Sequence, residues 1–265
     1  MPVPVFRIDR GDESSPVVLH VPHSSRRISG PARASIALDD TALLAELDAM
    51  TDAYTDLIAA RAAAAARVRP WTFVNEWSRL VVDPERFPDD EREEMAAVGM
   101  GAVYTRTSSG QRLRPEDPPF ARRLRDAHFH PYAQGMTALV DERLAATGRA
   151  IVVDVHSYPP RALPYELHGD GPRPQVCLGT DGMHTPPWLR DAAAKAFAGY
   201  EVGFDSPFAG CYVPLKHHGA DERVSALMVE LRRDGYQHAP GGEPHSGLDR
   251  LAASLATLVD ALGAR

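Results

Sequence analysis

Two histidines and a glutamate stand where apolar runs give way to polar residues. His23 follows the run at residues 17–21, His156 follows the run at 150–155, and Glu230 lies in the run at 225–231. In an open α/β sheet the carboxyl ends of the strands share one edge, where ligands bind. Two imidazoles and a carboxylate at that edge predict a zinc site with one position open for water. The alternative is that each histidine is an ordinary surface or capping residue.

Acidic residues near these histidines could complete the site. Asp154 could accept the second ring N–H of a metal-bound histidine, or it could simply face a loop N–H. Asp48, Asp52 and Asp56 are spaced four apart on a predicted helix, where like charges cost about 0.2–0.5 kcal/mol per pair unless a cation is near. A solvated acidic face explains Asp48 and Asp56, and we predict that Asp52 is the third metal ligand. Asp56 and Glu46 stay open as alternatives for that ligand.

Two serines and a second histidine motif have simpler explanations. Ser24 and Ser157 follow the site histidines, but the chain has no G-x-S-x-G elbow, so a serine hydrolase ranks last among the alternatives. His245 lies in a Pro-His-Ser-Gly segment that resembles the first histidine motif. Ser246 and Asp249 form an S-x-x-D pattern there, and a helix cap accounts for it.

The elements that must position these residues alternate between strands and helices. Strands are expected at residues 17–21, 71–74, 80–82, 150–155, 175–178 and 225–231, and helices from 39 or 40 to 66 and at 119–147, 187–198 and 248–262. Residues 84–118, rich in Pro, Gly and charge, are expected to form a long functional loop. This alternation predicts an α/β sandwich with a mainly parallel sheet. No repeat or linker divides residues 1–265, so we expect one domain.

Composition restricts the class of function. The chain has 265 residues, 44% of them hydrophobic, and a formal net charge of −7. This charge argues against binding to nucleic acid or to an anionic membrane surface. Cys177 and Cys211 form no CxxC pattern, which fits a reducing compartment. No signal peptide or membrane-spanning run is found, so a cytoplasmic protein is expected, and the oligomeric state stays open.

Six short motifs, in order over residues 17 to 236, resemble the N-formylglutamate amidohydrolase family. They are Val21-Pro22-His23-Ser24-Ser25, Thr51-Asp52 with Asp56, Ser78-Arg79-Leu80-Val81-Val82-Asp83 with Arg86, Asp154-Val155-His156-Ser157, Pro207-Phe208-Ala209-Gly210-Cys211-Tyr212, and Leu227-Met228-Val229-Glu230. The resemblance implies a three-layer α/β sandwich with a mainly parallel or mixed sheet. This phosphorylase/hydrolase-like fold is similar to that of the zinc carboxypeptidases and aspartoacylase.

The resemblance also implies roles for individual residues. His23 and His156 would bind one Zn²⁺ per chain together with an acidic ligand, although another divalent metal would fit the same shell. Glu230 would be the catalytic base for hydrolysis of the formyl amide of N-formyl-L-glutamate, a step of histidine degradation. A small acidic N-acyl amino acid is therefore the expected partner.

Substrate recognition is expected from five further residues. Arginine grips carboxylates bidentately, and the resemblance implies that Arg79 and Arg86 bind the substrate carboxylates, with Asn75 near them. The alternative pairs Arg79 with Asp83 and Arg86 with Asp89 or Asp90. Tyr212 and His217 are weaker candidates for substrate contact.

Three positions depart from the family pattern, and all concern the substrate pocket. Ser25 replaces a glycine, Glu85 replaces an asparagine, and Gly210-Cys211-Tyr212 replaces a GGY-type turn. One competing function is therefore a deacylase or peptidase of the same fold that acts on another N-acyl amino acid. A second competitor is a relative that has lost catalysis, although the presence of His23, His156 and Glu230 counts against it.

Overall fold

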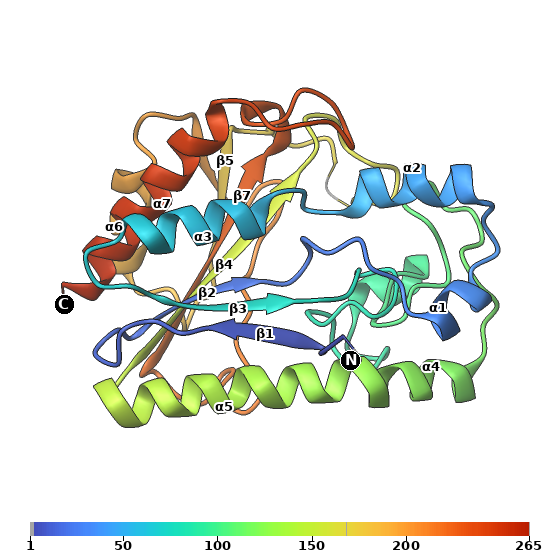
Figure 1. The fold of residues 1–265 in the computed structure, drawn as a ribbon, viewed down its shortest axis with the longest axis horizontal. Helices are drawn as coiled ribbons and strands as arrows, with labels where there is room; N and C mark the ends of the chain where they lie inside the picture. Colours follow the sequence, from blue (N-terminus) through green and yellow to red (C-terminus); the bar gives the residue numbers. More distant parts are fainter. Residues whose placement is uncertain (1–2, 168, 265) are drawn as a thin grey trace.

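A seven-stranded mixed sheet forms the centre of the computed structural model, which describes residues 3–167 and 169–264 (Figure 1). The strand order is β1-β3-β2-β4-β7-β5-β6. Strands β3, β2, β4 and β7 run parallel, whereas β1 is antiparallel to β3 and β5 is antiparallel to β7. The strands are β1 (Phe6–Asp9), β2 (Val17–Val21), β3 (Trp71–Asn75), β4 (Ala150–Tyr158), β5 (Val176–Gly179), β6 (Val202–Phe204) and β7 (Val224–Arg232).

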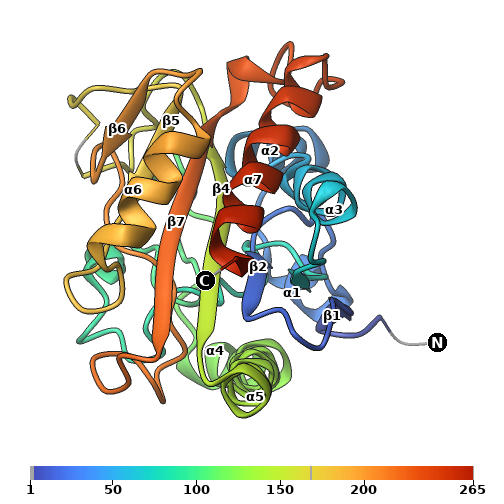
Figure 2. The same ribbon diagram turned by 90° about the vertical axis from the view of Figure 1, so that its left-hand side faces the viewer.

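Helices cover both faces of this sheet. They are α1 (Gly30–Ser35), α2 (Asp40–Met50), α3 (Thr55–Ala65), α4 (Pro118–Leu124), α5 (His130–Thr147), α6 (Pro187–Ala196) and α7 (Gly247–Gly263). Two 3-10 helices, η1 (Glu94–Val98) and η3 (Arg233–Gly235), and one π-helical turn, η2 (Arg125–Phe129), complete the set. Helices α3, α6 and α7 lie on one face, and α5 runs along the other (Figures 1 and 2). The expected three-layer α/β sandwich with a mixed sheet is confirmed.

The alternation of side chains along the central strands decides which residues face which layer. In β4, Ile151, Val153 and Val155 pack in the core beneath α3 and α7. Ala150 and Val152 pack against α5 instead. Because successive strand residues point to opposite faces, the even-numbered polar residues that follow in β4 project toward the α5 face. The same alternation holds in β2 and β7.

Two predicted elements differ from those observed. The helix expected from residue 39 or 40 to 66 is interrupted, because α2 ends at Met50 and α3 begins at Thr55. Tyr54 has φ 65, a left-handed conformation that a continuous helix cannot contain. The strand expected at residues 80–82 is a turn whose side chains are buried between loops and helices. An apolar run here predicted burial correctly but strand structure wrongly.

Two of the three predictions about helix ends are confirmed. Asp39 caps α2, accepting a hydrogen bond from Ala42 N at 2.8 Å. Gly148 ends α5 with φ 77, a conformation that favours glycine. Ser246 precedes α7, but its side chain makes no cap hydrogen bond, so the predicted helix cap is wrong in that detail. No helix in the described ranges is long and apolar enough to span a membrane.

Candidate active site

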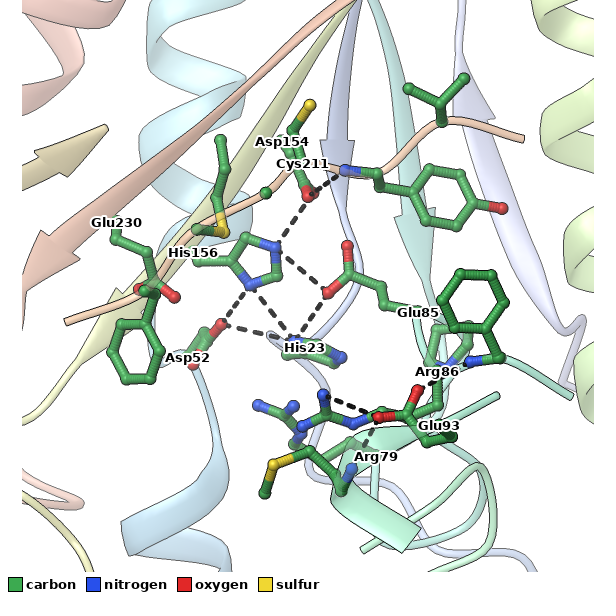
Figure 3. A pocket seen from close by; sticks show the side chains of 18 of the residues that line it. His23, Asp52, Arg79, Glu85, Arg86, Glu93, Asp154, His156, Cys211 and Glu230 are labelled. Carbon is green, nitrogen blue, oxygen red and sulfur yellow. Dashed lines mark hydrogen bonds and ion pairs between the residues drawn. The ribbon is translucent and has the colours of Figure 1, made fainter. Parts of the chain in front are cut away.

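Side chains from β4, from β7 and from the loops that follow β2, α2, β3 and β6 converge at the carboxyl edge of the parallel strands (Figure 3). His156 and Glu230 are direct neighbours in the β4–β7 register, so their side chains leave the same face of the sheet. His23 follows β2, and Asp52 lies in the break between α2 and α3. Asp52 and the two histidines are at most 4% exposed. The sheet edge therefore holds two imidazoles and a carboxylate away from bulk water.

Three atoms that could coordinate a metal, one from each of these residues, form a small triangle, called the donor triangle below. His23 Nδ1 lies 3.3 Å from His156 Nδ1, and Asp52 Oδ2 lies 3.0 Å from His156 Nδ1 and 3.6 Å from His23 Nδ1. A tetrahedral zinc ion with bonds of about 2.0–2.2 Å separates its ligand atoms by roughly 3.3–3.6 Å. The triangle therefore has the dimensions of a zinc shell. Asp56 and Glu46, the other acidic candidates, are not among the residues that line this cavity.

The second ring nitrogen of each histidine faces a carboxylate. His23 Nε2 is hydrogen-bonded to Asp83 Oδ1 at 2.9 Å, whereas His156 Nε2 lies 3.0 Å from Asp154 Oδ1 at ion-pair distance but has no hydrogen-bond partner among the described residues. With the ring protons on the Nε2 atoms, the two Nδ1 lone pairs face the same point as the Asp52 carboxylate. Such an arrangement is unfavourable without a cation, and carboxylates behind the histidines are typical of metal centres. The residues present therefore fit a divalent metal.

Arg233 fixes the orientation of Asp52. Its guanidinium donates to Asp52 Oδ1 at 3.0 Å, to Ser157 Oγ at 3.1 Å and to the carbonyl of Ala49 at 2.6 Å. With Oδ1 held in this way, Oδ2 points toward the histidines. Ser157 is occupied by the same guanidinium, which gives no support to a role as a nucleophile.

The pKa shifts of the site residues indicate that the pocket favours positive charge. Burial disfavours the imidazolium form of His156, but Asp154, Glu85 and Asp52 raise its pKa well above the usual value. Burial likewise opposes ionisation of Asp52, but its contacts with His156 and His23 hold its pKa well below the usual value. A field that favours a proton on an imidazole also favours a bound metal cation.

Glu230 has a different environment from the other carboxylates. Burial raises its pKa to about 8, and its Oε2 has no hydrogen-bond partner among the described residues. A carboxylate whose pKa lies near neutrality can both accept and return a proton under ordinary conditions. Glu230 is therefore suited to acid–base chemistry beside the donor triangle.

Glu85 creates a second possible arrangement of ligands. One donor atom from each of His23, Glu85 and His156 fits within a sphere suitable for a metal, as does one from each of His20, Glu85 and Asp154. Glu85 Oε2 lies 3.2 Å from His156 Nε2 and 3.6 Å from His23 Nδ1, and its Oε1 has no hydrogen-bond partner among the described residues. The set with Asp52 uses the Nδ1 atoms of both histidines and leaves each Nε2 toward a carboxylate, so we favour it.

The two predicted substrate arginines both line the cavity but differ in how they are paired. Arg79 donates to Asp83 Oδ2 at 2.7 Å, which is the ion pair given as the alternative in the sequence analysis. Arg86 lies 3.6 Å from Asp83 and 3.8 Å from Glu93, and its buried Nε has no hydrogen-bond partner among the described residues. Neither Asp89 nor Asp90 is an ion-pair partner that the structure gives to Arg86. Arg86 is thus better placed than Arg79 to receive a carboxylate.

The other three predicted substrate residues are placed differently. Tyr212 lines the cavity and packs on His20, with ring centroids 4.5 Å apart. Asn75 lies outside the residues that line the cavity and donates to the carbonyl of Pro22 at 2.9 Å, which holds the turn that carries His23. His217 also lies outside that lining and contacts Asp141 at 2.9 Å. Asn75 and His217 therefore support the surrounding loops in this structure.

Four residues of this centre were not predicted as site residues. They are His20, Asp83, Glu85 and Arg233. His20 follows Val18 by two positions, so strand alternation places it on the α5 face, where it bonds to Asp154 Oδ1 at 2.7 Å and to Tyr132. The alternation alone could have placed His20 there. Asp83, Glu85 and Arg233 lie beyond strand ends, and their direction depends on loop conformation.

This fold and centre define an α/β protein of the hydrolase-like class, with a candidate metal site at the carboxyl edge of its sheet. The family model for N-formylglutamate amidohydrolase matches residues 15–237. The chain belongs to the N-formylglutamate amidohydrolase family, and it is a hydrolase of that amidohydrolase family.

Solved structures agree with this fold. The crystal structure of N-formylglutamate amidohydrolase from Ralstonia eutropha JMP134 is 20% identical, with a TM-score of 0.83 over 99% of this chain and 98% of that chain. A gene product from Agrobacterium tumefaciens is 19% identical, with a TM-score of 0.69 over 98% of this chain and 95% of that chain. No curated protein sequence matches the chain.

Proposed function

We propose that this chain hydrolyses the N-formyl amide of N-formyl-L-glutamate in a metal-dependent reaction that yields formate and glutamate. The observation that carries the proposal is the donor triangle of His23, Asp52 and His156 beside the unpartnered Glu230 carboxylate. Residues 1–265 act as one catalytic domain in this proposal. One Zn²⁺ per chain is the expected metal.

The metal would be held by His23 Nδ1, His156 Nδ1 and Asp52 Oδ2. When bound, zinc polarises a carbonyl and lowers the pKa of a bound water to about 7. The hydrogen bond to Asp83 orients the His23 imidazole, the Asp154 carboxylate lies 3.0 Å from His156 Nε2, and Arg233 keeps Asp52 in place. These contacts reduce the reorganisation that catalysis requires.

Glu230 moves the protons of the reaction. Its carboxylate accepts a proton from the attacking water as the new C–O bond forms at the formyl carbon. It then delivers this proton to the amide nitrogen as the C–N bond breaks, because the nitrogen would otherwise have to leave as an amide anion, which is a very poor leaving group. Burial raises the pKa of Glu230 to about 8 in the metal-free chain, and a cation at the donor triangle would lower this pKa toward neutrality, where the carboxylate can accept the proton.

Substrate carboxylates are bound on the side of the arginines. Arg86 offers a buried Nε without a hydrogen-bond partner among the described residues, and Arg79 lies beside it with its charge shared with Asp83. A guanidinium binds a carboxylate more strongly in a desolvated cavity than at the surface. The arginines thereby select an acidic amino acid as the leaving group.

The test measures metal content and formate release on the same preparations. We expect about one zinc per chain and release of formate from N-formyl-L-glutamate that stops on chelation and returns with zinc. Glu230→Gln should keep the metal and lose kcat by about 100-fold or more. Glu222→Gln, an exposed glutamate just before β7, is the matched control and should behave like the unaltered protein.

Three outcomes would contradict parts of the proposal. Zinc without formate release would exclude N-formyl-L-glutamate and direct the search to other acyl groups. Formate release that survives chelation would exclude the metal-dependent reaction. Absence of both metal and activity would favour a non-catalytic relative.

A further inference from the structure

The cavity is larger than the proposed substrate requires. Its volume is about 950 Å³. Cavities of roughly 300–1,000 Å³ enclose drug-sized ligands, whereas N-formyl-L-glutamate has only about a dozen non-hydrogen atoms. A substantial part of the space therefore lies beyond the donor triangle and the arginines.

One wall of this additional space is a face of α5. The residues of α5 that line the cavity are His130, Ala133, Gln134, Thr137, Ala138 and Asp141. Their spacing of three or four places them on one side of the helix. At 1.5 Å per residue, this face extends about 16 Å along the helix axis. The space is thus an elongated groove.

The loop after Cys211 forms the second wall. Tyr212, Val213, Leu215 and Lys216 of this loop line the same cavity. Lys216 forms an ion pair with Asp141 at 2.6 Å, which ties the loop to α5 at one end of the groove. Leu215 is 50% exposed, although it is a large apolar side chain.

The backbone of the α5 wall offers apolar contact and no free hydrogen-bonding groups. Backbone N–H and C=O groups inside α5 are already paired within the helix, so a peptide laid along it would leave its own backbone groups unpaired. Ala133, Thr137 and Ala138 are small and leave room, and the exposed Leu215 adds apolar surface. Of the charged wall residues, Asp141 and Lys216 are paired with each other. An alkyl chain needs only such contacts.

The groove lies on the side where the acyl part of a substrate would point. Arg79 and Arg86 lie on one side of the two histidines, and Asp154 and Cys211 lie on the other (Figure 3). The loop that forms the second wall begins directly after Cys211. A substrate with its glutamate carboxylates on the arginines and its amide at the donor triangle would therefore extend its acyl group toward the groove.

We infer that the groove between α5 and residues 212–216 binds the alkyl chain of N-acyl-L-glutamates, so the site accepts medium-length acyl groups as well as formyl. This inference rests on the proposed function, because it places the amide of the longer substrates at the same donor triangle. The hydrolysis is unchanged: water adds to the acyl carbon, the C–N bond breaks, and a carboxylic acid and glutamate are released.

The test compares N-formyl-, N-butanoyl- and N-octanoyl-L-glutamate, with glutamate release as the readout for the zinc-loaded protein. We expect kcat/KM to rise with chain length and to be about tenfold or more higher for the octanoyl than for the formyl substrate. Ala138→Trp, which fills the groove, should lower the octanoyl-to-formyl ratio at least tenfold. Ala146→Trp is the matched control, an exposed alanine of α5 outside the cavity lining, and should leave the ratio unchanged.

Binding separates a failure of this inference from a failure of the proposed function. Calorimetry on zinc-loaded Glu230→Gln should show N-octanoyl-L-glutamate binding about tenfold or more tighter than the formyl compound, with the difference lost when Ala138→Trp is added. Equal binding of both compounds, or formate release with no hydrolysis of longer substrates, would overturn the groove. Groove-dependent binding with no turnover of any substrate would leave the groove standing and refute the proposed hydrolysis.

Discussion

The two arginines of the cavity have different neighbours. Replacing each one should therefore affect a different property, either zinc affinity or substrate binding. Arg79 neutralises Asp83, and Asp83 in turn holds the Nε2 of His23. Arg86 has a buried Nε without a hydrogen-bond partner among the described residues. Arg79 therefore acts on the metal site through its hydrogen bond to Asp83, whereas Arg86, 3.6 Å from Asp83 and not hydrogen-bonded to it, is available to the substrate.

This difference predicts separate outcomes for Arg86→Met and Arg79→Met. Arg86→Met should raise KM for N-formyl-L-glutamate by about 10- to 100-fold, because a charged hydrogen bond contributes about 1.5–3 kcal/mol. It should weaken zinc binding less than Arg79→Met does, because Arg86 lies 3.6 Å from Asp83 without a hydrogen bond to it. Arg79→Met should weaken zinc binding about tenfold or more, because Asp83 would lose its partner in a buried site. Steady-state kinetics and competition with a chelating dye measure the two effects. Equal losses of zinc affinity in both variants would refute the assignment.

At the scale of elements, the end of β5 fixes the position of the loop that lines the cavity. A Cβ on Gly179 would lie 2.3 Å from the carbonyl oxygen of Gly210 and 2.4 Å from Met228 Cε. Gly210 and Met228 both line the cavity. The absence of a side chain at residue 179 therefore allows the loop at residues 207–212 to pack closely on the sheet.

We predict that Gly179→Ala lowers both stability and activity. The added methyl group must displace the Gly210 backbone, which should cost about 1–3 kcal/mol of unfolding free energy and reduce kcat/KM by moving the cavity wall. Gly182→Ala is the control, because a Cβ there meets no atom within 4 Å. Thermal melting and steady-state kinetics test both variants. Unchanged stability in Gly179→Ala would show that the loop adapts freely.

The sequence predicted the elements with strong periodicity and missed those defined by tertiary contacts. Continuous apolar runs identified β2, β4 and β7, and these three strands supply or precede His23, His156 and Glu230. Strands β1 and β6 are short and, unlike the equally short β5, contain no fully buried residue, so no apolar run marks them. The run at residues 80–82 has the composition of a strand but is buried by loops, because hydrophobicity predicts burial and not conformation.

The site follows the same division between local and tertiary information. Asp52 was expected on a continuous helix with Asp48 and Asp56, but the break at residues 51–54 turns it toward the histidines. Asp48 instead pairs with Arg26 at 2.6 Å. The positions of Asp83, Glu85 and Arg233 depend on how loops fold over the sheet edge. No spacing rule along the chain contains that information.

For the whole molecule, a metal at the donor triangle would link the loop of Asp52 to β2 and β4. Such a ligand stabilises the folded state in proportion to its binding, by about 2.7 kcal/mol at a concentration 100-fold above its Kd. For a chain of this size, 1 kcal/mol corresponds to about 2–4 °C in Tm. Metal content should therefore be visible in thermal stability.

We predict that adding zinc, at a concentration 100-fold above its Kd, to protein from which the metal has been removed by a chelator raises Tm by roughly 5–10 °C. His156→Ala removes one donor and should show little or no rise, because the remaining pair binds zinc weakly. Differential scanning calorimetry in the presence of zinc or magnesium measures the change, and magnesium should have a much smaller effect. An equal rise in His156→Ala would place the metal elsewhere.

The buried carboxyl of Glu230 makes the stability of the metal-free protein depend on pH. Its pKa is raised by burial to about 8 in the folded chain, compared with an ordinary value of 4.5. Between these values the unfolded chain has released the proton and the folded chain retains it, so the free energy of unfolding falls as pH rises from about 4.5 to 8. Glu230→Gln has no proton to release.

We therefore predict that this variant is more stable than the unaltered metal-free protein at pH 8, by about 2 kcal/mol or more, and that the difference nearly vanishes near pH 4.5. Urea unfolding across this pH range tests the prediction, with Glu222→Gln as the exposed control. A difference independent of pH would show that Glu230 titrates normally and would weaken its proposed role as the base.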